Sequence, residues 1–247
     1  MRLFVIAFQF LTIVPLPFQV RCEERDLGRS MALFPLVGLA LGGMLAGVDF
    51  LFAGRVAAEV GDLLLVTLLS LITGALHLDG LADVCDGFAA RGPKERFLAV
   101  MKDSRVGAVG VVGLILGIGL KYQAIHALSP ALKWQTLLLF PMAARCAQVV
   151  TAVGARTART EGLGAAFVNG VGPLQLMAAL LLTGVAGCAL LGPSWLALLL
   201  VLSLCTFGCR RYFEQRLDGV TGDIIGFVSE LNEITALILI PVFCGRI

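Results

Sequence analysis

The chain has 247 residues, of which 58% are hydrophobic and only 15% are charged. Soluble domains carry about a quarter charged residues, so this composition excludes an ordinary soluble protein and predicts an integral membrane protein. The formal net charge of +2 is too small to indicate a nucleic-acid partner. No linker or charged tract interrupts the apolar pattern, so residues 1–247 are predicted to form one membrane-embedded domain with no soluble domain.

Long apolar runs recur along the whole chain. A helix needs about 20 residues to cross a bilayer, and in lipid only helices or closed barrels pair all their backbone groups. Because the runs are continuous rather than alternating, we expect an all-α polytopic bundle of about seven to eight transmembrane helices. Pro15 and Pro17 would bend the first run or leave it half-inserted, and the seventh run is short. The candidate spans are residues 3–20, 30–53, 62–80, 106–125, 134–153, 173–192, 195–209 and 224–244.

Lysine and arginine gather in alternate loops. Most of them lie within residues 21–29, 91–105, 156–159 and 210–216. The positive-inside rule places such loops in the cytoplasm. We therefore expect a bacterial-type cytoplasmic (inner) membrane protein whose functional face is cytoplasmic. The opposite side is expected to hold only Arg2, Arg55, Lys121, Lys133 and Arg246.

The third span ends in GALHLDGLADVCDG, residues 74–87. At 100° per residue on a helix, Asp79, Asp83 and Asp86 share one narrow stripe, and His77 points away from it. Aligned acids repel one another, and near lipid they need a cation or strong hydrogen-bond donors. Oxygen ligands at this density suit Mg²⁺. The stripe therefore predicts a magnesium site, with a solvated helix end as the alternative.

Basic residues precede the fourth span in MKDSRVGAVG, residues 101–110. Lys102, Ser104 and Arg105 surround Asp103, and free amides at the following helix start would complete a phosphate cradle. Basic residues at a membrane edge also follow from the positive-inside rule alone. Arg145 is different, because it lies inside a span and needs an anion, either an acid of the protein or a substrate phosphate.

A second acidic stripe lies in GVTGDIIGFVSELNE, residues 219–233. Asp223 and Glu230 are seven residues apart and hence on one helix face, and Glu233 follows a turn later. A carboxylate inside a membrane indicates function by default, and its alternative is a salt bridge or a helix contact. Clustered acids, basic residues and glycines on one face together indicate metal-assisted phosphoryl transfer on a membrane-associated substrate.

Several of these motifs occur together in an order and spacing that resemble the cobalamin synthase family, the adenosylcobinamide-GDP ribazoletransferases. The similarity runs along nearly the whole chain. It is carried by FLTIVPLP (10–17), FPLVGLALG (34–42), HLDGLADVCDG (77–87), MKDSRVGAVG (101–110), EGLG (161–164) and TGDIIG (221–226) followed by Glu230.

The resemblance implies that adenosylcobinamide-GDP and α-ribazole, or its 5′-phosphate, give adenosylcobalamin, or its 5′-phosphate, and GMP, with Mg²⁺ as cofactor. The attacking group would be the ribose 3′-hydroxyl. Besides the two substrates, membrane lipid is an expected partner, and the glycine-rich spans permit a homo-oligomer. The candidate metal ligands are Asp79, Asp83, Asp86, Asp223 and Glu230. The candidate catalytic residues are Asp83, His77 and Asp103, and the candidate substrate-binding residues are Lys102, Ser104, Arg105, Arg145, Thr221 and Gly222.

Two alternatives stay open at this stage. One is an enzyme like the CDP-alcohol phosphotransferases, which also place glycines and aspartates at a cytoplasmic helix end. Here Asp86 follows Asp83 too soon for that pattern. The other is an ion-coupled transporter using Asp49, Arg145 and Glu233. Transporters usually show internal repeats, and the sequence shows no convincing one.

Overall fold

The computed structural model describes residues 1–17, 20–159 and 162–245. Phe18 and Gln19 of the first predicted span, Glu161 of EGLG, and Arg246 therefore lie outside the described residues. Within the described part the backbone is almost entirely helical, and its extended pairing is confined to an isolated bridge between Thr157 and Val220. The helices are α1 (Arg2–Leu11), α2 (Glu24–Ser30), the 3₁₀ turn η1 (Met31–Leu33), α3 (Phe34–Phe52), α4 (Ala58–Ile72), α5 (Leu76–Ala89), α6 (Lys94–Val100), α7 (Ala108–His126), α8 (Pro130–Ala152), α9 (Leu163–Gly170), α10 (Pro173–Leu191), α11 (Ser194–Leu217) and α12 (Gly222–Cys244).

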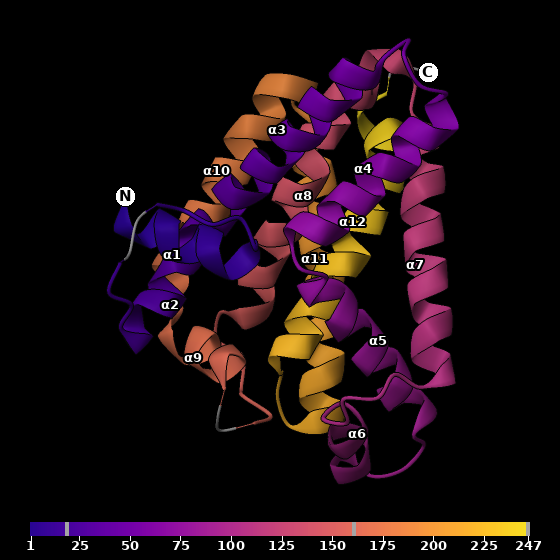
Figure 1. Cartoon of the computed structure of the whole chain (residues 1–247). Coiled ribbons are helices and arrows are strands. Elements are labelled where there is room, and N and C mark those ends of the chain that lie inside the picture. Colours follow the sequence, from indigo (N-terminus) through magenta and orange to yellow (C-terminus); the bar gives the residue numbers. More distant parts are fainter. Residues whose placement is uncertain (18–19, 160–161, 246–247) are drawn as a thin grey trace.

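The polytopic helical fold predicted from the sequence is confirmed, but the described residues contain five or six candidate spans rather than the expected seven to eight, and α8 is not among them. Among the described residues, five helical segments are long and apolar enough to cross a membrane: Glu24–Phe52, which includes α3, and helices α7, α10, α11 and α12. Helices α4 and α5 meet that description only as a pair. Figure 1 shows the long helices gathered into a bundle, with the short helices α1, α2 and α9 on one flank and α6 at the lower end.

Within its described residues, the first apolar run does not form a membrane-spanning helix, in agreement with the expectation that Pro15 and Pro17 would bend it or leave it half-inserted. Helix α1 has ten residues and is about 15 Å long, which is too short for a bilayer core of about 30 Å. The chain turns extended at Thr12, with φ −141° and ψ 155°, and Pro15 and Pro17 follow, whose rings cannot continue a helix hydrogen-bond ladder.

The third and seventh predicted spans also differ from the structure. The run over residues 62–80 is broken at Gly74 and Ala75, which take the left-handed φ values of 58° and 54°, and α4 and α5 meet there at 90°. The seventh span is a 24-residue helix that continues beyond residue 209 to Leu217. The last turns of α11 therefore extend past the apolar run, carrying arginines of the 210–216 cluster.

Helix α8 is the central helix of the bundle, packed by α3, α10, α11 and α12. Nearly every residue from Thr136 to Ala152 is buried. Helix α3 approaches it closely through two glycines, since a Cβ on Gly38 or Gly42 would stand 2.5 Å from a carbonyl oxygen of Pro141 or Leu137. Small residues permit such contact between membrane helices.

The three later basic loops meet at one end of the bundle, the lower end in Figure 1. Lys94 pairs with Asp218, and Arg216 donates a hydrogen bond to the carbonyl of Gly92. The backbone N–H of Val220 donates to the carbonyl of Arg156 at 2.8 Å. These contacts join residues 91–105, 156–159 and 216–223 into one surface.

Candidate active site

The acids of two motifs meet where α5 crosses the start of α12. The break at Gly74 and Ala75 starts α5 in a new direction, which places Asp79 and Asp83 near the basic end. Gly80 permits the crossing, because a Cβ there would stand 2.5 Å from the carbonyl oxygen of Asp223. Thr221 caps α12, its hydroxyl accepting the N–H of Ile224 at 3.3 Å, and so fixes the first turn on which Asp223 lies.

A cavity of about 210 Å³ opens beside this crossing. Asp79, which is exposed, lies at its rim, whereas His77 and Gln148 are buried. The lining thus combines acidic and polar side chains with apolar and aromatic ones. The lining consists of Phe10, Met31, Phe34, Leu76, His77, Asp79, Gln148, Leu163, Gly164, Phe167, Gly222, Asp223, Ile225 and Gly226.

Asp83 is half-buried one turn after Asp79 on α5. The negative charges of Asp79, Asp223 and Asp86 act on it, and the positive charge of Arg159 opposes them. Asp79 and Asp223 line one cavity, and the assignment of Asp79, Asp83 and Asp223 to one metal site stays a prediction. Like charges this close favour a bound cation or strong donors.

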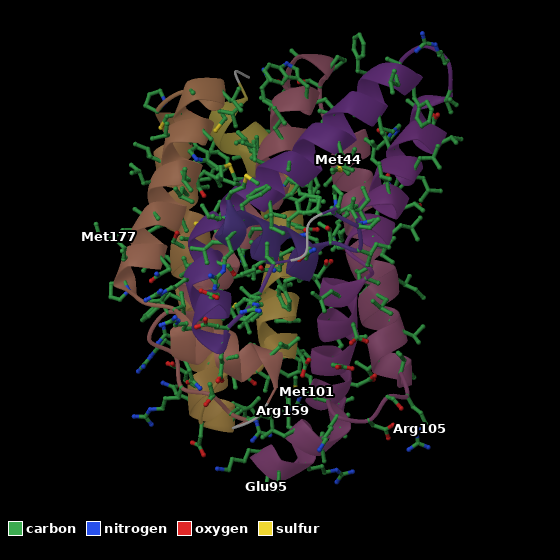
Figure 2. All side chains as sticks on the ribbon, turned by 60° about the vertical axis from the view of Figure 1, so that its left-hand side comes forward. Met44, Glu95, Met101, Arg105, Arg159 and Met177 are labelled. Carbon is green, nitrogen blue, oxygen red and sulfur yellow. The ribbon has the colours of Figure 1, made fainter. Side chains whose placement is uncertain are left out.

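Arg159 is the residue of this site that the sequence analysis missed. Its Nη1 donates to Oδ2 of Asp223 at 3.0 Å, and its Nη2 donates to the carbonyl of Leu98 at 3.3 Å. Figure 2 shows Arg159 beside Met101, at the lower end of the bundle. The basic residues of its loop predicted only the orientation of the chain in the membrane. The one sequence signal that could have indicated a role in the site was the position of Arg159 just before the EGLG motif.

Asp86 has a different neighbour from the other two aspartates of its stripe. Its carboxylate accepts the backbone N–H groups of Gly107 and Gly110, both at 2.7 Å, and so caps the start of α7, where negative charge is favourable. The free amides predicted for a phosphate cradle are therefore occupied by Asp86. That part of the prediction was wrong.

The remaining residues of the predicted cradle lie in an exposed loop. Asp103 accepts hydrogen bonds from Nε, Nη2 and the backbone N–H of Arg105 at 3.0, 2.7 and 3.1 Å, which lower the pKa of Asp103 to about 2. Lys102 and Ser104 are exposed beside them. In Figure 2 Arg105 projects at the outer edge of the molecule, away from Arg159. With Asp86, this pair lines a separate open hollow.

Glu230, Glu233 and Arg145 form a buried charge cluster with Lys121. Nζ of Lys121 lies 2.6 Å from Glu230 and 2.5 Å from Glu233, and Nη1 of Arg145 lies 2.5 Å from Glu233. The anion beside Arg145 is thus an acid of the protein, and the salt-bridge reading of both glutamates is confirmed. Lys121 was wrongly placed in a loop, since it is only 3% exposed within α7.

His77 is held by a neighbouring helix. The side-chain nitrogen of Gln148 donates to its Nε2 at 2.7 Å, and the ring is only 4% exposed. His77 therefore lines the cavity from its buried side, with one ring nitrogen already engaged. This arrangement suits an orienting role.

The acidic group fits a magnesium ion by its donor chemistry. No three His, Cys, Asp or Glu side chains of the described residues form a complete metal-binding group by themselves. Magnesium does not need one, because it is usually held by one or two carboxylates together with water and substrate phosphates. Asp79, Asp83 and Asp223 supply oxygen donors of that kind on the exposed side of the α5–α12 crossing.

Comparison with known proteins gives a consistent result. The model of the cobalamin-5-phosphate synthase family matches residues 3–241. The chain is 56% identical over 246 residues to an adenosylcobinamide-GDP ribazoletransferase of Geotalea daltonii, covering 100% of this chain and 99% of that protein. Proteins of the same name from Pseudomonas syringae pv. syringae (39% identity, 95% of this chain, 97% of that protein) and Clostridium novyi (32% identity, 99% and 98%) also match. No solved structure matches the chain.

Proposed function

The chain belongs to the cobalamin-5-phosphate synthase family, and on that premise we propose that it is an adenosylcobinamide-GDP ribazoletransferase of cobalamin biosynthesis. It joins adenosylcobinamide-GDP to α-ribazole or its 5′-phosphate and releases GMP. The observation that carries this proposal is the meeting of two family motifs at one cavity. Asp79 of HLDGLADVCDG and Asp223 of TGDIIG line this cavity, and Asp83 follows one turn after Asp79 on α5. Arg159 lies between Asp223 and the α6 backbone.

The proposed step is a phosphoryl transfer. A ribose hydroxyl oxygen bonds to the phosphorus attached to the cobinamide, the P–O bond of the diphosphate breaks, and GMP leaves with the bonding electron pair. The hydroxyl proton passes to a nearby base. Asp83 is the candidate base, because it is half-buried between Asp79 and the start of α12. His77, whose ring is fixed by a hydrogen bond from Gln148, has an orienting role as part of the cavity wall.

We propose Mg²⁺ as the cofactor, held by Asp79 and Asp223, the two carboxylates that line the cavity, together with the substrate diphosphate. When bound, it neutralises charge on the diphosphate and on the departing GMP. Arg159 supplies a fixed positive charge beside Asp223, and the exposed backbone of Gly222 leaves room for a substrate phosphate. Asp86, Glu230 and Arg145 are given structural roles in this proposal, since each already has a partner.

We propose that the enzyme lies in a bacterial-type inner membrane with this end facing the cytoplasm. The proposal is supported by the basic loops joined at the same end as the acidic group, in agreement with the positive-inside rule. Soluble nucleotide-bearing substrates would then reach the acids from the cytoplasm.

The test uses the purified protein in lipid with adenosylcobinamide-GDP, α-ribazole and Mg²⁺, and measures GMP and the corrinoid product. Asp83→Asn should lower kcat by about 100-fold or more, the usual cost of losing a general base, and EDTA should stop GMP release. Asp218→Asn is the matched control. This aspartate lies at the same end but is exposed and paired with Lys94, so the change should have little effect. Undiminished GMP release by Asp83→Asn, or in EDTA, would refute the assigned site.

A further inference from the structure

Three phenylalanine rings from three helices form one wall of the cavity, here called the aromatic floor: Phe10 of α1, Phe34 of α3 and Phe167 of α9. The ring centroids of Phe10 and Phe167 are 4.3 Å apart, and those of Phe34 and Phe167 are 5.6 Å apart. Phe34 and Phe167 are buried, whereas Phe10 is partly exposed. The floor is thus a rigid apolar surface with one accessible ring.

The cavity that contains the aromatic floor is also lined by acids. Asp79 and Asp223 line the same cavity as the three rings. His77 and Gln148, the two polar residues that are most deeply buried in this lining, are hydrogen-bonded to each other. A ligand that fills the cavity would therefore meet aromatic and aliphatic groups as well as carboxylates.

The size and polarity of the cavity restrict which part of the substrates can enter. A volume of about 210 Å³ cannot take a corrin macrocycle with its amide side chains. Guanine is flat, but its edge carries several donors and acceptors, and three phenylalanine rings offer these groups no hydrogen-bond partner. The base of α-ribazole is a benzimidazole, which is flat and apolar along its benzo edge and fits a floor of aromatic rings.

We propose that the aromatic floor binds the base of the acceptor nucleoside, so that the ribose lies at the rim beside Asp79 and Asp223. This inference rests on the proposed function and adds the place and orientation of one substrate. The reacting hydroxyl then belongs to the half of the nucleoside nearest the acids, and the corrinoid diphosphate approaches from the exposed side of the α5–α12 crossing. Phe10, Phe34 and Phe167 become determinants of base specificity.

Phe10→Leu is the decisive variant, because it keeps an apolar side chain and removes the accessible ring. Its KM for α-ribazole should rise about three- to tenfold, because an aromatic contact usually contributes that much to binding in addition to the burial of apolar area. The KM for adenosylcobinamide-GDP should be unchanged. Phe10→Trp, which retains a ring face, should restore the KM to within about twofold. Phe4→Leu is the control, since Phe4 is equally half-buried on α1 but contacts Phe8 outside the cavity lining.

Each other outcome has a defined meaning. A rise only in the KM for adenosylcobinamide-GDP would place the guanine on the floor and overturn the proposal. An unchanged pair of KM values, as expected if a lipid chain fills the cavity, would also overturn it. Equilibrium dialysis of labelled α-ribazole against the protein in lipid gives an independent readout. A wild type that retains the nucleoside but releases no GMP would contradict the proposed function, whereas equal retention by wild type and Phe10→Leu would contradict the aromatic floor.

Discussion

Asp103 and Arg105 form a salt bridge in the exposed loop between α6 and α7. The hydrogen bonds from Arg105 lower the pKa of Asp103 to about 2, so its carboxylate is ionised above that pH and gains a proton only when the pH falls through that value. An acid with so low a pKa is a weak proton acceptor. The low pKa of Asp103 therefore favours Asp83 over Asp103 as the base.

The prediction is that Asp103→Asn leaves the pH profile of kcat unchanged between about pH 5 and pH 9, because the native carboxylate does not titrate in that range. The measurement is GMP release at saturating substrates over that range. Arg105→Gln serves as a companion variant that breaks the same pair from its other side. Loss or displacement of the acid limb in Asp103→Asn alone would show that Asp103 takes up the proton after all.

At the level of single residues, periodicity correctly grouped Asp79 with Asp83 but could not identify the neighbour of Asp86. Spacing on one helix says which side chains share a face, and it contains no information about a helix start 21 residues later. The same limit hid Arg159, whose partner Asp223 is 64 residues away. Arg145 and Glu233 were recognised as needing partners, but only the packing of α8 on α12 shows that they satisfy each other.

At the level of elements, glycines decide how closely helices approach. Gly80 brings α5 onto the first turn of α12, and Gly164 brings the start of α9 to the same turn, where its Cβ would lie 2.6 Å from the backbone nitrogen of Gly222. Both glycines belong to motifs that carry the family resemblance, Gly80 to HLDGLADVCDG and Gly164 to EGLG. Their structural role is to assemble the rim of the cavity.

Gly80→Ala should therefore displace α5 from α12 and reduce kcat/KM by about 100-fold, since a shift of about 1 Å at reacting groups can cost that much. Overpacking should also lower stability by about 1–3 kcal/mol. Gly119→Ala is the matched control, because nothing lies within 4 Å of a Cβ at that helical position. It should keep its activity and gain up to about 1 kcal/mol from helix propensity. Equal activity of the two variants would contradict the close approach.

Element existence was far easier to predict than element continuity. Apolar runs located every long helix, because a membrane-spanning segment leaves a strong compositional trace. The 90° bend between α4 and α5 left no such trace, since the residues around Gly74 stay apolar while the backbone at Gly74 and Ala75 turns left-handed. The bend directs α5 toward the start of α12, where the proposed site lies.

For the whole molecule, the basic loops and the acids lie at one end, and the sidedness of that end can be measured. Glu95 is exposed in α6 at this end (Figure 2). Ser129 is exposed in the connection between α7 and α8, which lies at the opposite, upper end in Figure 1. With the exposed native Cys22 and Cys205 changed to serine, Glu95→Cys should be shielded from a membrane-impermeant maleimide in intact bacteria, and Ser129→Cys should react. Labelling at Glu95→Cys without cell lysis would overturn the proposed orientation.

The buried charge cluster imposes an order on how the chain can be made. Its two cations, Lys121 and Arg145, are synthesised well before its two anions, Glu230 and Glu233, which lie on the final helix. A lone cation at the centre of a membrane helix costs about 2.5–3.5 kcal/mol on insertion scales. Until α12 is synthesised, the nascent bundle carries an uncompensated positive interior, so the insertion of α12 is the event that neutralises this charge and completes the cluster.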